Sequence, residues 1–257
     1  MLGLFISSRS LKHKRLRRLG FITMLLDKIR SKFQFRLKDR STAGSILATA
    51  LIGNLKSREE RQQSIVLGIP RGGVIVADII AKKLSCEFDI IIPHKLRAPH
   101  NEEVAIGAIM EDGTTYLNEV IVKELEIPKE YIEKEKSQQL EEIKRRASLY
   151  RNNTLKEYYR IENRTVILAD DGAATGATII AAARWLRATK NPAHFIIAIP
   201  VAPKDTVNLL KRENIDHLEV ITSPPASNFK SVGQYYQSFE PVTDEQVRQI
   251  MRKRNLL

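Results

Sequence analysis

The segment Thr165–Thr178, which reads TVILADDGAATGAT, constrains this chain more than any other part of it. An apolar run ends in two neighbouring carboxylates, Asp170 and Asp171, and a loop of small residues leads into a helix predicted from Ala177 to Arg187. A loop in this position leaves backbone N–H groups unpaired, and the helix dipole favours an anion beside them. Carboxylates one step earlier can accept hydrogen bonds from sugar hydroxyls. The segment therefore predicts a site for a sugar phosphate.

The order of strand, paired acids, small-residue loop and helix resembles the phosphoribosyl-pyrophosphate (PRPP) motif of the type I phosphoribosyltransferases. It is neither a Walker loop nor a dinucleotide fingerprint, because Gly-Lys-Ser/Thr and a strand followed by G-x-G-x-x-G are both absent. The resemblance implies that Asp170 and Asp171 contact ribose hydroxyls. It also implies that one continuous loop surrounds the 5′-phosphate: Gly172, Ala173, Ala174, Thr175, Gly176, Ala177 and Thr178.

A second candidate loop is GIPRGG, which follows the first predicted strand. The consecutive glycines Gly72 and Gly73 leave backbone N–H groups open, and Arg71 adds a planar donor suited to phosphate. Taken alone, Pro-Arg-Gly-Gly is typical of a plain turn. Beside the downstream motif it resembles the pyrophosphate-binding loop of the same family.

A third segment, HKLRAPHNEEVAIGAI, resembles the flexible loop that closes over PRPP in such families. We expect Lys95 to be its main cation, residues 98–103 to be mobile, and closure to strengthen contacts to the departing pyrophosphate. The alternative for Lys95 and Arg97 is a solvated loop. His94 and His100 are not expected to form a metal site, because no third ligand stands at suitable spacing.

These segments, with EIKRRASLYR, AIPVAP and FKSVGQYYQSF, are similar to an uncharacterised bacterial and archaeal phosphoribosyltransferase subfamily over about residues 35–250. Its acceptor is not one that we can name. The resemblance implies Asp170, Asp171 and Lys95 as catalytic residues. Mg²⁺ is the expected cofactor, with no direct protein ligand, held by PRPP and by waters near the two aspartates.

One position departs from the pattern of enzymes that act on 6-oxopurines. These usually carry an acid at the fifth motif position, where this chain has Ala174. A methyl group cannot exchange a proton, so a hypoxanthine or guanine acceptor is disfavoured. A general base must come from elsewhere, and we consider Glu102, Glu103 and the acceptor itself.

Strands that are apolar on both faces alternate with helices, which predicts a parallel sheet covered on both sides, with ligands beyond the carboxyl ends of the strands. The resemblance implies an α/β type I phosphoribosyltransferase fold, with a mostly parallel central sheet, flanking helices and a small hood region. Four aromatic residues within 229–239 either stack on a flat base or pin an irregular tail to the sheet. The predicted strands are 65–69, 88–93, 104–110, 114–117, 166–168, 194–200 and 218–221. The predicted helices are 41–55 with Ser41 as its cap, 74–84, 118–125, 128–150, 177–187, 204–212 and one that begins after Thr243 or Asp244.

The net charge of +12 is concentrated near the N-terminus, because residues 1–40 hold twelve Lys and Arg against two Asp, a net of +10. We expect residues 1–34 to be a basic extension that is either disordered or the product of a mis-assigned translation start. Residues 35–257 are expected to be the phosphoribosyltransferase domain. We favour translation starting at Met24, and keep open a transit peptide and an arm for nucleic acid or anionic lipid. The single Cys86 fits a reducing compartment as a buried small residue, and no apolar run suggests a membrane span, so we expect a cytoplasmic protein.

The function predicted first is a PRPP-dependent pentosyltransferase of nucleotide metabolism that transfers phosphoribosyl to an unknown nitrogenous acceptor. A PRPP-sensing regulator without turnover is the alternative from another class. A nucleic-acid-binding module rests on the basic extension alone, and a homodimer is left open.

Overall fold

The structure, a computed structural model, describes residues 36–55, 57–150 and 161–254. The elements below all belong to one compact unit, Leu37–Leu257. The predicted basic extension, residues 1–34, lies outside the described residues.

Five parallel strands form the central sheet, in the order β2-β1-β6-β7-β8. The strands β1 and β6 are direct neighbours, and Gly68 at the end of β1 is in register with Ala169 at the end of β6. The two predicted phosphate loops therefore leave the sheet side by side. The strands are β1 (Ile65–Gly68), β2 (Glu87–Ile90), β6 (Thr165–Ala169), β7 (His194–Val201) and β8 (His217–Thr222).

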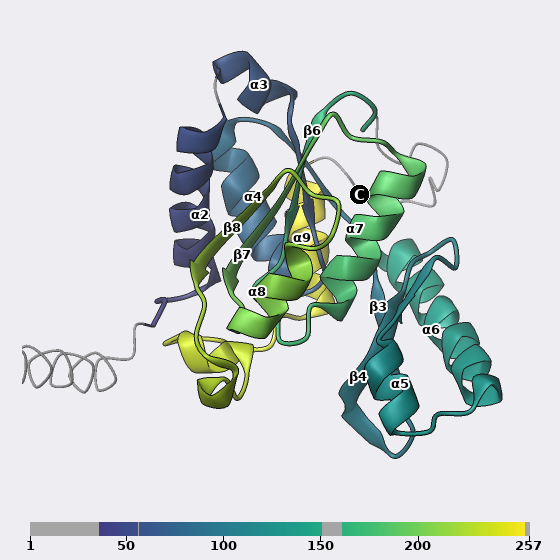
Figure 1. The fold of residues 1–257 in the computed structure, drawn as a ribbon. Coiled ribbons are helices and arrows are strands. Elements are labelled where there is room, and N and C mark those ends of the chain that lie inside the picture. Colours follow the sequence, from purple (N-terminus) through teal and green to yellow (C-terminus); the bar gives the residue numbers. More distant parts are fainter. Residues whose placement is uncertain (1–35, 56, 151–160, 255–257) are drawn as a thin grey trace, which may run out of the picture. The chain divides into compact units, whose positions relative to one another are not determined.

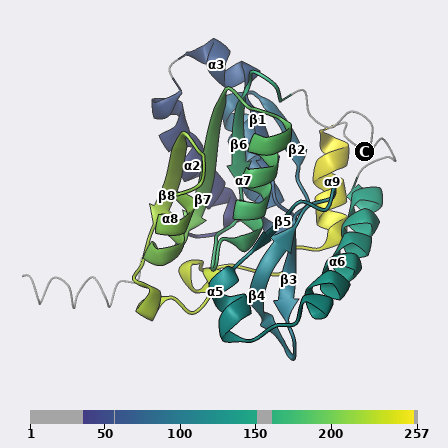
Figure 2. The same cartoon turned by 45° about the vertical axis from the view of Figure 1, so that its right-hand side comes forward.

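Helices cover both faces of this sheet (Figures 1 and 2). Alternate strand residues point to opposite faces, so Val66 and Ile167 join a cluster with α2, α4 and α9, whereas Leu67 and Leu168 join one with α7 and α8. The mostly parallel, helix-covered α/β sheet that the sequence predicted is confirmed. The helices are α2 (Arg40–Asn54), α4 (Gly72–Leu84), α7 (Ala177–Thr189), α8 (Lys204–Leu210) and α9 (Asp244–Lys253).

An antiparallel lobe follows β2, at the lower right of Figure 1. It contains β3 (His94–Ala98), β4 (Asn101–Ile109), β5 (Thr115–Leu117), α5 (Glu119–Glu124) and α6 (Lys129–Tyr150). The stretch 98–103, expected to be an irregular loop, instead forms the end of a β-hairpin in which Ala98 pairs with Asn101, while its predicted mobility stays a prediction. His100 takes a left-handed φ of 62° in its turn, where a glycine would have been the expected turn signal. The long helix α6 packs against β3.

The aromatic tail, residues 229–239, packs against α2 and the end of β7. Tyr235 and Tyr236 are buried with Leu37, Ala43 and Val201. The tail contains two short 3₁₀ turns, Ala226–Asn228 and Val232–Tyr235. Of the two interpretations of these aromatic residues, the structure favours the anchoring one.

One local prediction fails at the start of the described chain. Asp39, not Ser41, caps α2, because its side chain accepts a hydrogen bond from the Thr42 backbone N–H at 2.7 Å. A short helix that was not predicted, α3 (Arg58–Gln63), precedes β1 and is capped by Ser57.

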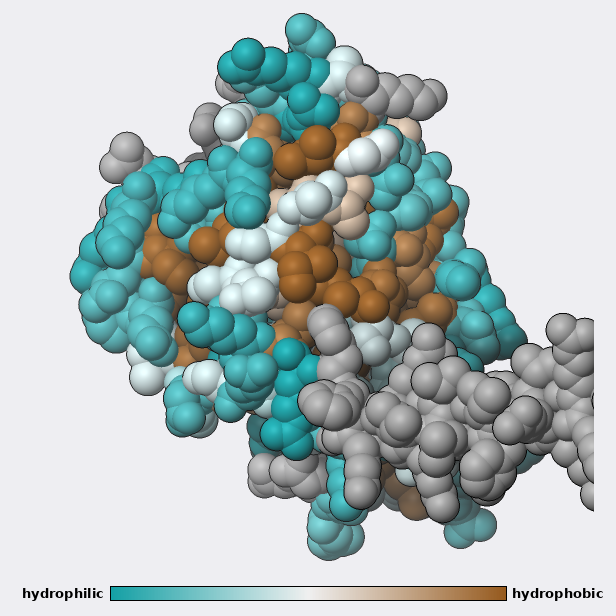
Figure 3. Space-filling view, turned by 90° about the vertical axis from the view of Figure 1, so that its left-hand side faces the viewer, coloured by the Kyte–Doolittle hydropathy of each residue, from teal (hydrophilic) through white to brown (hydrophobic). Residues whose placement is uncertain are grey.

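Helix α2 leaves part of its apolar side chains at the surface. On the side where α2 lies, hydrophobic residues reach the surface between polar ones (Figure 3), and Ile46 and Ile52 are 39% and 41% exposed.

The predicted burial of Cys86 is confirmed, and burial raises the pKa of its thiol to about 12. No helix among the described residues is long and apolar enough to span a membrane.

Candidate phosphate-binding site

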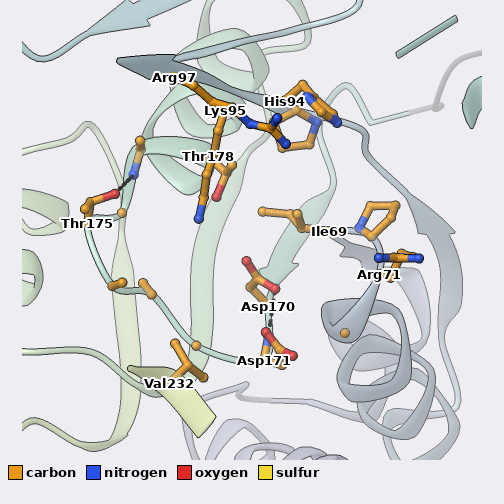
Figure 4. A pocket seen from close by; sticks show the side chains of 18 of the residues that line it. Ile69, Arg71, His94, Lys95, Arg97, Asp170, Asp171, Thr175, Thr178 and Val232 are labelled. Carbon is orange, nitrogen blue, oxygen red and sulfur yellow. Dashed lines mark hydrogen bonds between the residues drawn. The ribbon is translucent and has the colours of Figure 1, made fainter. Parts of the chain in front are cut away.

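A pocket of about 390 Å³ opens beyond the carboxyl ends of β1 and β6 (Figure 4). It brings together all the residues predicted from the sequence for PRPP binding except Gly73, which lies one residue inside α4. Most of the lining comes from the turn after β1, the turn after β6 and the start of β3, and α6 and the aromatic tail add one residue each. The lining comprises Ile69, Pro70, Arg71, Gly72, Pro93, His94, Lys95, Arg97, Arg146, Asp170, Asp171, Gly172, Ala173, Ala174, Thr175, Gly176, Ala177, Thr178 and Val232.

The glycines after β1 are needed for close approach. A Cβ atom on Gly72 would stand 1.8 Å from Oδ2 of Asp171, and one on Gly73 would stand 2.7 Å from Cα of Asp170. The turn after β1 thus packs directly on the turn after β6, without room for a side chain. The peptide bond between Pro70 and Arg71 is cis, and α4 begins at Gly72.

The turn after β6 leads into α7 through Gly176, whose φ of 75° a residue with a side chain rarely adopts. Ala177 and Thr178, the first residues of α7, line the pocket, and their backbone N–H groups have no partner within the helix, as at any helix N-terminus. One predicted donor differs: the N–H of Ala173 is bonded to the carbonyl of Val201 at 2.9 Å and is not available to a phosphate. The carbonyl of Ala174 accepts from Thr206 Oγ1 at 2.6 Å.

The carboxyl of Asp170 points into the pocket, with Lys95 on one side and Arg71 on the other (Figure 4). Burial raises its pKa well above the usual range, and the neighbouring charge of Asp171 raises it further, while Lys95 opposes the shift. Asp170 therefore disfavours its own charge until a donor or cation arrives, which suits a group that accepts hydrogen bonds from a ligand.

Asp171 differs from Asp170 because a cation already holds it. Its Oδ2 accepts from Nε of Arg40 at 2.7 Å, and the Arg40 side chain is only 10% exposed. The Arg40 guanidinium also stacks on the ring of Phe239, 3.8 Å from its centroid. The hydroxyl of Tyr236 donates to the Asp171 carbonyl at 2.7 Å. Asp171 thus ties the turn to α2 and the tail, a positioning role that the sequence did not reveal.

The cations predicted for pyrophosphate differ in their present contacts. Lys95 extends from β3 toward Thr178 and the turn after β6 (Figure 4). Arg71 is 43% exposed and lies 3.7 Å from a carboxylate oxygen of Asp244 at the start of α9. Arg97 lines the pocket, and its backbone N–H donates to Glu135 at 3.0 Å, which fixes β3 to α6.

His94 lines the pocket as a buried, neutral imidazole. Burial lowers its pKa to about 4, and the charge of Arg146 lowers it further. Its Nδ1 is buried and has no hydrogen-bond partner among the described residues. The side chains of Glu102 and Glu103, considered as general bases, lie outside what the structure describes. Nor do the described residues contain a group of three His, Cys, Asp or Glu placed to hold a metal ion.

The lowered pKa of His94 predicts an acid-sensitive contribution to stability. Between pH 6.5 and 4 the imidazole of His94 is protonated in the unfolded chain but stays neutral in the folded protein. The free energy of unfolding therefore decreases as the pH falls through this window. The full loss is roughly 3–4 kcal/mol, since each pKa unit corresponds to roughly 1.4 kcal/mol. Urea unfolding at pH 7 and pH 4.5 should show a smaller pH dependence in His94→Asn than in the unsubstituted protein. A measured imidazole pKa near 6.5 in an NMR titration would contradict this prediction.

The fold and the site define an α/β protein whose candidate ligand site lies at the carboxyl edge of a parallel sheet, where two turns, paired acids and cations meet. The comparisons with known proteins identify the family. The model of the phosphoribosyl transferase domain matches residues 41–235, so the chain belongs to the phosphoribosyl transferase family.

Individual relatives agree with this assignment. The chain is 34% identical over 209 residues to proteins of two Mycobacterium tuberculosis strains, CDC 1551 and H37Rv, whose names assign phosphoribosyl transferase provisionally. The match covers 81% of this chain but 45% of each relative, so the chain spans less than half of their length. The crystal structure of TT1426 from Thermus thermophilus is 35% identical, with a TM-score of 0.67 over 85% of this chain and 99% of that one.

Proposed function

We propose that the protein transfers the 5-phosphoribosyl group of PRPP to a nitrogenous acceptor and releases pyrophosphate. The observation that carries this proposal is the pairing of β1 with β6. This pairing brings the turn that contains Arg71 and Gly72 beside the Asp170–Thr178 turn, and Lys95 of β3 lines the same pocket. Family membership supports the class of reaction, and the pocket supports the choice of substrate.

The residues suit the separate parts of PRPP. The N-terminus of α7 and the hydroxyls of Thr175 and Thr178 would hold the 5′-phosphate, and Asp170 would accept hydrogen bonds from ribose hydroxyls. In the transfer, an acceptor nitrogen forms a bond to C1′ while the C1′–oxygen bond breaks, and pyrophosphate leaves with the bonding electrons. Arg71 and Lys95 would stabilise the negative charge that develops on this leaving group.

Mg²⁺ fits this site as an ion carried in with the substrate. Among the described residues Asp170 forms no ion pair, unlike Asp171, and Mg²⁺ prefers oxygen ligands while retaining several waters. When bound, the ion would neutralise charge on the pyrophosphate oxygens. Asp170 would hold one of its waters or a ribose hydroxyl.

The experiment has two stages. Calorimetry with PRPP, with and without Mg²⁺, should show one site whose affinity depends on the ion. Pyrophosphate release is then measured against purines, pyrimidines, nicotinic acid and anthranilic acid. Release with one acceptor class supports the transferase. Binding without release across the panel supports the regulatory alternative, and no PRPP binding rejects both.

A further inference from the structure

Helix α6 places Arg146, a residue to which the sequence assigned no role, in the wall of the pocket. The helix belongs to the antiparallel lobe, and it is anchored there by Glu135, which accepts from the backbone of Arg97, and by Tyr131, which donates to the carbonyl of Arg97 at 3.1 Å. The far end of the same helix reaches the pocket at Arg146. The lobe therefore contributes a cation from a helix as well as Lys95 from a strand.

Glu142 holds Arg146 by one edge of its guanidinium. Nε of Arg146 donates to Oε1 of Glu142 at 2.8 Å, one helical turn away. Glu142 is itself fixed by two hydrogen bonds from Arg145, at 2.7 and 2.8 Å. The pKa of Glu142 is lowered to about 2, mainly by the hydrogen bonds from Arg145, so this carboxylate is charged at neutral pH. Both Nη groups of Arg146 remain without a protein partner in the described part of the chain, and the side chain is 20% exposed.

Arg146 and Arg71 both line the pocket, and α6 and α9 connect them through Tyr150 and Asp244. The buried hydroxyl of Tyr150 is bonded to Asp244, the residue that pairs with Arg71. The pKa of Tyr150 is raised mainly by burial, and the charges of both Arg146 and Arg71 oppose this rise. Arg71 is therefore linked to Tyr150 through Asp244, and Tyr150 stands one helical turn from Arg146 on α6.

We infer that Arg146 binds the pyrophosphate of PRPP together with Arg71, and that Glu142 orients it for this purpose. The inference rests on the proposed function and adds a residue to its site. A guanidinium held by one edge presents its remaining N–H groups in a planar fork, which matches the spacing of phosphate oxygens. Because it is already oriented, little side-chain freedom is lost when the ligand binds.

The test compares Arg146→Gln with Lys144→Gln by calorimetry. Lys144 lies on the same helix and its replacement removes the same charge, but it is 67% exposed, pairs with Glu141 and does not line the pocket. Dissociation constants are measured for Mg²⁺-pyrophosphate, PRPP and ribose 5-phosphate. Arg146→Gln should weaken pyrophosphate and PRPP by about 10- to 100-fold, the range for a lost charge-assisted hydrogen bond. Ribose 5-phosphate should bind equally well in both variants.

Arg146→Lys provides a second readout, because it keeps the charge and loses the planar fork, and it should fall between the unsubstituted protein and Arg146→Gln. Undiminished pyrophosphate affinity in Arg146→Gln would overturn the inference and leave the proposed function standing. An equal loss for ribose 5-phosphate would also overturn it, since the effect would then not be local. If the unsubstituted protein bound neither PRPP nor pyrophosphate, the proposed function would fail first.

Discussion

Replacing Gly73 with alanine is expected to destabilise the protein by about 3 kcal/mol, the upper part of the usual range for overpacking, and to abolish PRPP binding. The new Cβ would lie 2.7 Å from Cα of Asp170 and 2.9 Å from the carbonyl oxygen of Ala169. Both contacts are with backbone, which cannot rotate away as a side chain can. The clash would push the turn after β6 away from α4 and displace the Asp170 carboxyl. Urea unfolding and PRPP calorimetry measure the two effects.

Gly53 offers the matched control. It lies in α2, and a Cβ built there has nothing within 4 Å. Gly53→Ala should therefore stabilise the protein by about 0.5–1 kcal/mol, as alanine does in a helix, and leave PRPP affinity unchanged. A Gly73→Ala protein as stable as Gly53→Ala would show that the two turns are not packed as described.

Asp170→Asn is expected to lower PRPP affinity by about 10- to 100-fold without loss of stability. Asparagine cannot supply a charged acceptor to ribose hydroxyls or to Mg²⁺-bound water, and one charge-assisted hydrogen bond contributes about 1.5–3 kcal/mol. Because the folded state raises the pKa of Asp170, its ionisation above pH 4 costs stability, and the neutral amide removes this cost. Calorimetry and thermal unfolding at pH 7 measure the two quantities.

Asp171→Asn, in contrast to Asp170→Asn, should lower the stability of the protein. It leaves the guanidinium of Arg40, only 10% exposed, without its charged partner, so stability should fall. Joint replacement of both aspartates should thus abolish Mg²⁺-dependent PRPP binding but also destabilise the protein through Asp171. Unaltered PRPP affinity in Asp170→Asn would contradict the assignment of Asp170 to the ribose.

The sequence predicted the parts of the site that depend on local pattern. Strand, turn and helix follow one another at Gly68–Gly73 and again at Ala169–Ala177, and parallel pairing puts both turns at one edge. Contacts between distant residues could not be predicted in this way. Arg40 and Asp171 stand 131 positions apart, and nothing in either segment indicates the pair.

The lobe was predicted least well, for two physical reasons. The β3–β4 hairpin turns at Pro99-His100, where His100 takes the left-handed conformation without a glycine to signal it. Arg146 stands in a charged helix whose acids and bases pair three or four residues apart, so its sequence reads as a solvated face. Only the packing of α6 against β3 shows which of these arginines reaches the pocket.

The hydrogen bonds between β1 and β6 also fix how far apart the N-termini of α4 and α7 can be. Neighbouring strands lie about 4.8 Å apart, and β1 and β6 lead directly into the turns before α4 and α7. The N-termini of the two helices therefore cannot move apart without breaking hydrogen bonds of the sheet. A molecule that carries an anionic group at each end of a short linker can bind the N-terminus of one helix first. Its second anionic group is then present at high effective concentration beside the N-terminus of the other helix. Ribose 5-phosphate and pyrophosphate added as a mixture lack that linkage, so together they should occupy the pocket far more weakly than intact PRPP.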